Sequence, residues 1–176
     1  MSESAVSAYA VEKRFAAATV TRWLALAAGD RDALLDVATR LRLGENQLRD
    51  VLDDLAAIAA RRDCSIAAAL DDAELRAALQ RPLGRNEAIK AVKQVLRRLR
   101  YPQLSAAEQR LAELGRSLRL PAGVHLGLPE HLEGEHVTVT LRARSAADLR
   151  SQAQTLAAAL QGGALDEMFA VLGGLW

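Results

Sequence analysis

The spacing of apolar residues changes along this chain, and that change limits the folds it can adopt. Up to about residue 118, apolar side chains recur every three or four positions, as on one face of a helix. Over 124–128 and 137–141 they alternate with polar residues, which is typical of strands. Helical spacing returns after Ser145, a residue that favours a helix start. The sequence therefore predicts a mostly α fold with one small helix–strand–strand–helix module.

Three regions follow from this pattern. Residues 1–100 are expected to be all-helical, 103–161 to form a helix–β-hairpin–helix module, and 162–176 to form an apolar C-terminal tail. In the first region we expect one helix over 5–28 and a second one capped by Asp30. In the second region, Ser105 and Glu108 have the spacing of a capping box, and the simplest hairpin register places His125 opposite Thr140.

Several classes of function have no support in the sequence. The single Cys64 excludes an internal disulfide, and no apolar run reaches the ~18 residues of a membrane span. The chain starts without a basic and then apolar leader, so we expect a cytoplasmic protein. No glycine-rich phosphate loop or nucleophile elbow is present, and we expect neither an enzyme nor a bound cofactor.

All three histidines, His125, His131 and His136, fall in the hairpin region. Zinc is held by three or four such side chains, but these spacings match no metal motif. The chosen register also separates His125 from His136. We therefore predict a polar loop and no metal site.

Residues 34–52 have the pattern of a helix-turn-helix. Its close helix approach requires a small residue, which Ala38 supplies, and Gly44 lies at the turn. Arg42 stands where such motifs usually carry glycine. In the second helix Asn46, Gln47 and Arg49 can contact bases, whereas the helix also carries acidic residues that phosphate would repel, namely Glu45, Asp50, Asp53 and Asp54. The alternative is an ordinary packed helical corner.

Charge is concentrated in the middle of the chain. Residues 81–119 carry 10 basic and 3 acidic residues, while the whole chain has a net charge of only +1. On the helix expected over 86–100, one side groups the cations Lys90, Lys93, Arg97 and Arg100 beside an apolar stripe of Ile89, Val92, Leu96 and Leu99. Such a basic ridge is suited to phosphate contact, and the alternative is a solvated helix face.

The C-terminal half resembles a known domain. Leu111, Leu114 and Leu118 lead into Val124–Leu126, and a second strand over 137–141 runs into the capped segment Ser145–Leu149. This order is similar to the C-terminal dimerisation domain of ParB-type chromosome and plasmid partition proteins. The resemblance implies a homodimer that binds DNA, with the helix-turn-helix-like segment upstream. The family's N-terminal nucleotide-binding domain has no counterpart here, so CTP binding is not implied.

These observations favour a dimeric nucleic-acid-binding protein of partition-like or regulatory type, with DNA preferred over RNA. The candidate contacts are the four ridge cations together with Asn46, Gln47 and Arg49. The alternative is a protein-interaction adaptor whose hairpin module dimerises and whose basic helix binds an acidic protein. For either function we expect no association with a membrane.

Overall fold

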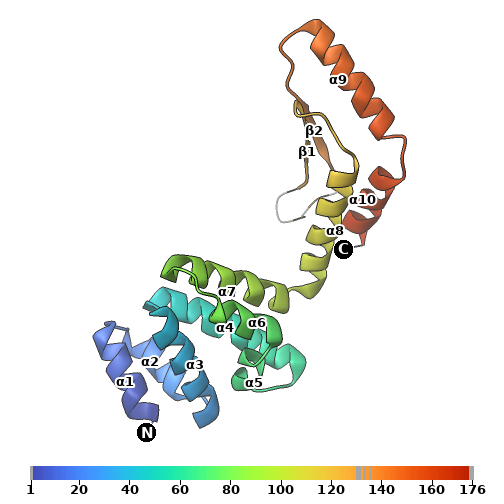
Figure 1. The fold of residues 1–176 in the computed structure, drawn as a ribbon. Coiled ribbons are helices and arrows are strands. Elements are labelled where there is room, and N and C mark those ends of the chain that lie inside the picture. Colours follow the sequence, from blue (N-terminus) through green and yellow to red (C-terminus); the bar gives the residue numbers. More distant parts are fainter. Residues whose placement is uncertain (1, 130–131, 133, 135, 175–176) are drawn as a thin grey trace. The chain divides into compact units, whose positions relative to one another are not determined.

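The computed structural model describes residues 2–129, 132, 134 and 136–174, which divide into two compact units, Met1–Pro102 and Gln103–Trp176. The first unit is helical: α1 (Ser2–Glu12), α2 (Ala17–Leu24), α3 (Ala28–Leu41), α4 (Glu45–Arg62), α5 (Ile66–Leu70), α6 (Ala73–Gln80) and α7 (Arg85–Arg100) (Figure 1). The second unit contains α8 (Pro102–Ser117), β1 (Val124–Gly127), β2 (Thr138–Leu141), α9 (Ala146–Ala159) and α10 (Ala164–Gly173). The predicted fold class, mostly α with a strand hairpin, is confirmed.

The single helix predicted over 5–28 is wrong. The chain forms α1 and α2 with a turn between them, because Arg14 adopts a left-handed backbone (φ 57°) and the Phe15 amide donates back to the Ala10 carbonyl (2.9 Å). The turn brings three aromatic rings together. The Phe15 ring lies edge-on to the Tyr9 ring with centroids 5.9 Å apart, and its centroid is 6.5 Å from that of Trp23. One straight helix would not bring these three rings together.

Helix α4 runs through the core of the first unit. Its buried side chains include Leu48, Leu52, Leu55 and Ile58, and it packs against α5 and α7. Burying apolar side chains of this size stabilises a fold by roughly 1.5–3 kcal/mol each. The long helix therefore fixes the position of α7, whose own buried stripe faces it.

Two predicted caps differ in the structure. Asp30 does not cap α3, because this helix begins earlier, at Ala28. The Asp30 carboxylate instead accepts a hydrogen bond from the Ala67 amide (2.8 Å) in the first turn of α5. Helix α8 begins at Pro102, three residues before the predicted Ser105 cap. Proline suits the first helical position because its missing N–H would have no helical partner there.

The last turn of α7 is held by a side chain from α4. The Arg61 guanidinium donates to the carbonyls of Leu99 and Arg100. Carbonyls at the end of a helix have no partner within the helix, so this arginine satisfies two of them.

In the second unit, β1 and β2 pair in an antiparallel hairpin that places His125 opposite Thr140, which confirms the predicted register. Ser145 caps α9 as predicted, its hydroxyl accepting from the Asp148 amide (3.1 Å). The expected apolar tail contains α10, and Met168 and Leu172 of this helix are buried in a core with Leu111 and other side chains of α8.

Candidate nucleic-acid interface

The corner between α3 and α4 is a three-residue turn. Arg42 adopts the left-handed conformation (φ 50°, ψ 50°), and the Leu43 amide donates to the Ala38 carbonyl (3.0 Å). Ala38 and Leu43 are fully buried, so both side chains belong to the packing of this corner. Left-handed backbone costs a non-glycine residue roughly 1–2 kcal/mol, and the packing of the corner offsets this cost.

Two contacts from the N-terminal helices fix this corner. The Tyr9 hydroxyl lies 2.8 Å from both the Ala38 and the Leu43 carbonyl oxygens, which it can serve as a shared donor. Burial raises the pKa of the Tyr9 hydroxyl, which keeps it protonated. At the start of α4, the Glu45 carboxylate accepts hydrogen bonds from the Thr19 hydroxyl (2.5 Å) and the Ala16 amide (3.2 Å). The hydrogen bond from Thr19 lowers the pKa of Glu45.

The three predicted base-contacting residues differ in their surroundings. Asn46 and Arg49 are exposed, and neither side chain makes a hydrogen bond within the described part of the chain. Gln47 is half-buried, and its Oε1 accepts from the Gly44 amide and from Arg85 Nη2, both at 3.1 Å. Asn46 and Arg49 are therefore available to a ligand, whereas Gln47 holds the start of α4 in place.

Helix α7 has the predicted apolar stripe and basic ridge. Ile89, Val92 and Leu96 are buried in the first-unit core. Beside them Lys90 and Arg97 are exposed, while Lys93 and Arg100 are half-buried. The ridge cations thus lie on the outer side of the helix, next to α4.

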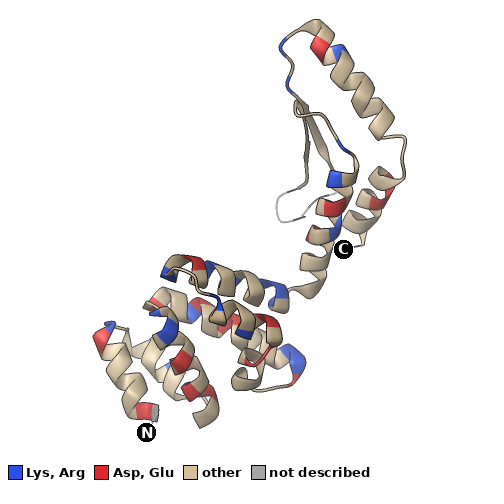
Figure 2. Cartoon of the chain, in the orientation of Figure 1, with Lys and Arg blue, Asp and Glu red and all other residues tan. Residues whose placement is uncertain are grey.

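Asp50, Asp53 and Asp54 of α4 are paired with cations from neighbouring helices. Figure 2 shows the two signs of charge side by side on α4 and α7. Lys93 Nζ lies 2.6 Å from an Asp50 carboxylate oxygen, and Arg100 Nη1 lies 2.7 Å from Asp54. On the other side, Arg22 of α2 pairs with Asp53 at 2.6 Å. Three of the four carboxylates that would repel phosphate are therefore each accompanied by a positive charge, whereas Glu45 accepts hydrogen bonds from Thr19 and Ala16.

Arg100 makes a second contact. Its guanidinium stacks over the Tyr101 ring, 5.0 Å from the centroid. The hydrogen bond to Asp54 raises the pKa of Arg100, so the residue is cationic at every physiological pH.

A groove of about 490 Å³ lies where α7 passes the start of α4. Its lining residues are amides, cations and one isoleucine: Gln47, Asn86, Ile89, Lys90, Lys93, Gln94 and Arg97. Further along the same two helices, a groove of about 370 Å³ combines cations with Asp50, Asp53 and Asp54. The positive character of this surface is therefore greatest near the N-terminus of α4.

The sequence reasoning missed two amides of the first groove, Asn86 and Gln94. They lie four residues before and after Lys90, so the spacing that groups the cations on one helix face also identifies these amides. Arg85 has a structural role: its Nη2 donates to the Arg42 carbonyl (2.9 Å) as well as to Gln47. This contact ties the beginning of α7 to the α3–α4 turn.

Within the described ranges, no three His, Cys, Asp or Glu side chains are grouped as a metal ion would require. His125 belongs to β1 and lies opposite Thr140, and His131 lies outside the described residues. Among the helices that the structure describes, none has both the length and the apolar character of a membrane span.

Comparison with known proteins returned no match. No family model, curated protein or solved structure matches the chain. The resemblance to partition proteins therefore stays a prediction from the sequence.

Proposed function

We propose that this chain is a dimeric nucleic-acid-binding protein whose first unit contacts duplex DNA through the start of α4 and the basic side of α7. The observation that carries the proposal is the corner at Arg42, which leaves Asn46 and Arg49 exposed beside a groove lined by cations and amides. In helix-turn-helix proteins the N-terminal residues of the second helix contact base edges. Asn pairs well with adenine, and Arg with guanine or phosphate.

The ridge cations have different parts in this proposal. Lys90 forms no ion pair with any described residue, so its full charge is available to a phosphate. Lys93 and Arg100 neutralise Asp50 and Asp54 and lower the repulsion that α4 would exert on DNA. Together with Arg97, these side chains supply contacts that depend on the phosphate backbone and not on the base sequence.

The second unit supports the dimeric part of the proposal. A two-stranded sheet is marginal by itself, and β2 has an unpaired edge within the described residues. Val139 on β2 is 39% exposed and Leu149 on α9 is 45% exposed, and Gln152 is the only buried residue of α9. Pairing of two hairpins edge to edge, with α9 as cover, would bury these apolar side chains.

A second candidate is the adaptor function, in which the groove at α7 binds an acidic segment of a protein partner. The side chains of Asp50 and Asp53 on the outer face of α4 are 58% and 49% exposed. This observation favours the adaptor, because a duplex lying along the whole of α4 would have to approach both carboxylates. The two candidates predict different binding: the DNA-binding protein binds any duplex through its phosphates, whereas the adaptor requires an acidic protein segment.

Fluorescence anisotropy with a labelled mixed-sequence duplex, titrated at several salt concentrations, tests the proposal. We expect binding that weakens steeply with salt, and a shallower salt slope for Lys90→Glu, because each phosphate contact contributes about 0.9 to that slope. Arg144→Glu is the control: it makes the same change in net charge, but on an exposed loop of the second unit. No binding at low salt, or equal losses in the two variants, would contradict the proposed interface.

A further inference from the structure

The second unit has a groove that the proposed DNA contact does not use. It measures about 410 Å³ and lies among α8, β1 and α10. Leu111 and Met168 form part of its apolar wall, and Arg116 and Arg119 are exposed cations of its lining. None of the described residues that line this groove is acidic. A ligand that combines an apolar group with a negative charge would therefore fit it.

Helix α10 presents such a pair of groups on its outer side. Phe169 is 44% exposed, and Asp166, one turn earlier, is also exposed. Residues three apart on a helix are neighbours on its surface. Asp166 makes no ion pair with a described residue, so both its charge and the Phe169 ring face solvent without a partner from the described chain.

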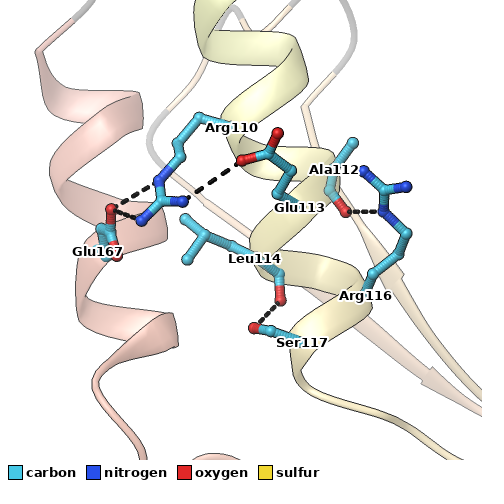
Figure 3. Close-up of polar contacts among 7 residues, drawn as sticks. All are labelled: Arg110, Ala112, Glu113, Leu114, Arg116, Ser117 and Glu167. Carbon is cyan, nitrogen blue, oxygen red and sulfur yellow. Dashed lines mark hydrogen bonds and ion pairs between the residues drawn. The ribbon is translucent and has the colours of Figure 1, made fainter.

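The neighbouring residues of α10 are already engaged. Glu167 accepts hydrogen bonds from Nε and Nη2 of Arg110, at 2.8 and 2.5 Å, across the α8–α10 contact (Figure 3). Met168 and Leu172 are buried against α8. The inner side of α10 thus holds the unit together, and the outer side carries an aromatic ring and a carboxylate that this packing does not require.

We propose that the groove receives Phe169 from a second copy of this chain, with Asp166 of that copy paired to Arg116 or Arg119. The charge and the apolar character of the two surfaces are complementary. Met168 forms part of the groove and Phe169 lies on the outer side of the same helix, so α10 carries both the ring and part of the groove that receives the ring of the second copy. A two-fold axis beside α10 therefore lets both copies make the contact at once, as isologous interfaces require.

This contact rests on the self-association in the proposed function and is independent of DNA binding. It uses α10 and the groove, whereas the hairpin contact uses β2 and α9. The α10 contact links the hairpin dimers of the proposed function to one another, so the full assembly is larger than a single dimer. Loss of one contact reduces the assembly to a dimer, and loss of both gives a monomer.

Sedimentation velocity of the full chain over a concentration series is the test. We expect species larger than a dimer in the wild type. Phe169→Ala and, separately, Asp166→Arg should weaken this association by about tenfold or more, the loss expected for an aromatic anchor and its ion pair. Arg116→Glu with Arg119→Glu should have the same effect, and combining them with Asp166→Arg should restore association. Val11→Ala, at a residue that is 78% exposed in the first unit, is the control.

The outcomes separate the two self-contacts. Recovery of the association in the charge-swapped variant supports the α10 contact, even if one single variant folds less well. Assembly that is unchanged in the α10 variants but lost when Val139 and Leu149 are replaced by Ser overturns the α10 contact and leaves the hairpin dimer standing. A wild type that is monomeric at every concentration overturns both.

Discussion

The ammonium group of Lys93 lies 2.6 Å from a carboxylate oxygen of Asp50, although the two residues are 43 positions apart in the sequence. The pair joins the basic ridge of α7 to the outer face of α4. An exposed ion pair of this kind contributes only about 0.2–1 kcal/mol to stability. Its larger effect is on the field that an approaching polyanion meets, because it keeps Asp50 from acting as an uncompensated negative charge.

Asp50→Asn is therefore expected to strengthen duplex binding, because it removes a carboxylate and frees Lys93. The gain should be a few-fold at low salt, since one charge near a phosphate in water is worth about 1 kcal/mol. Anisotropy titration at fixed ionic strength measures it. Lys93→Gln should weaken binding and Lys93→Gln with Asp50→Asn should return it toward the wild-type value; unchanged affinity in all three variants would exclude a role for this pair.

Tyr9→Phe is expected to destabilise the first unit by about 1 kcal/mol, because the phenol is the donor shared by the Ala38 and Leu43 carbonyls. Urea unfolding followed by circular dichroism gives the free energy of unfolding. Tyr101→Phe is the matched control, since Tyr101 is 44% exposed and its hydroxyl makes no hydrogen bond to a described residue. Equal losses in the two variants would show that the Tyr9 hydroxyl does not fix the α3–α4 turn.

Glu45 makes the stability of the first unit depend on pH. Its pKa is lowered in the folded protein, chiefly by the Thr19 hydroxyl, so the ionised form stabilises the fold above the pKa of the unfolded chain. This stabilisation is lost as the pH falls through the lower, folded pKa. Glu45→Gln should therefore be less stable than the wild type at pH 7, and the difference should shrink at acid pH.

Urea midpoints of the wild type and Glu45→Gln at pH 7 and at about pH 3 check this expectation, with the acid value chosen below the ordinary glutamate pKa. Glu87→Gln is the control, because Glu87 lies in the first turn of α7 and makes no hydrogen bond within the described residues. A difference for Glu45→Gln that does not vary with pH would mean that the carboxylate charge is not what the Thr19 and Ala16 contacts stabilise.

Gly123→Ala is expected to destabilise the second unit by about 1–3 kcal/mol through overpacking. A Cβ at this position would lie 2.7 Å from the Arg142 carbonyl oxygen and would collide with the Gln152 amide, which donates to that same oxygen. Thermal unfolding followed by circular dichroism measures the loss. Gly115→Ala is the control, because nothing lies within 4 Å of its Cβ and alanine favours the helix; a loss in both variants would point away from the Gln152 contact.

Local patterns were sufficient to predict much of this structure. The period of 3.6 placed Ile89, Val92 and Leu96 in the core and the cations beside them, because a helix face depends only on spacing. The hairpin register followed from alternation, since a shift by one residue would turn the buried Val124 and the half-buried Leu126 to the opposite face.

Tertiary contacts could not be predicted in the same way. The pairing of Asp54 with Arg100 joins residues 46 positions apart, and no local pattern specifies it. Asp30 was a sound candidate for a cap, yet its carboxylate accepts from the first turn of α5, whose own N-cap is Ser65, and not from α3. The turn at Arg14 brings Phe15 and Trp23 against Tyr9. These ring contacts form only when the chain folds back, so no local pattern predicts them.

Because Arg42 has a left-handed backbone, the residue type kept at this position shows whether selection acts on the side chain or on the turn. Glycine adopts the left-handed conformation without a steric penalty, so a change of Arg42 to glycine relieves the backbone at no cost to the turn. An arginine that persists here among diverging descendants of this chain would therefore persist for its exposed cationic side chain. Drift to glycine or asparagine would instead mark a lineage in which the turn is retained for the fold alone.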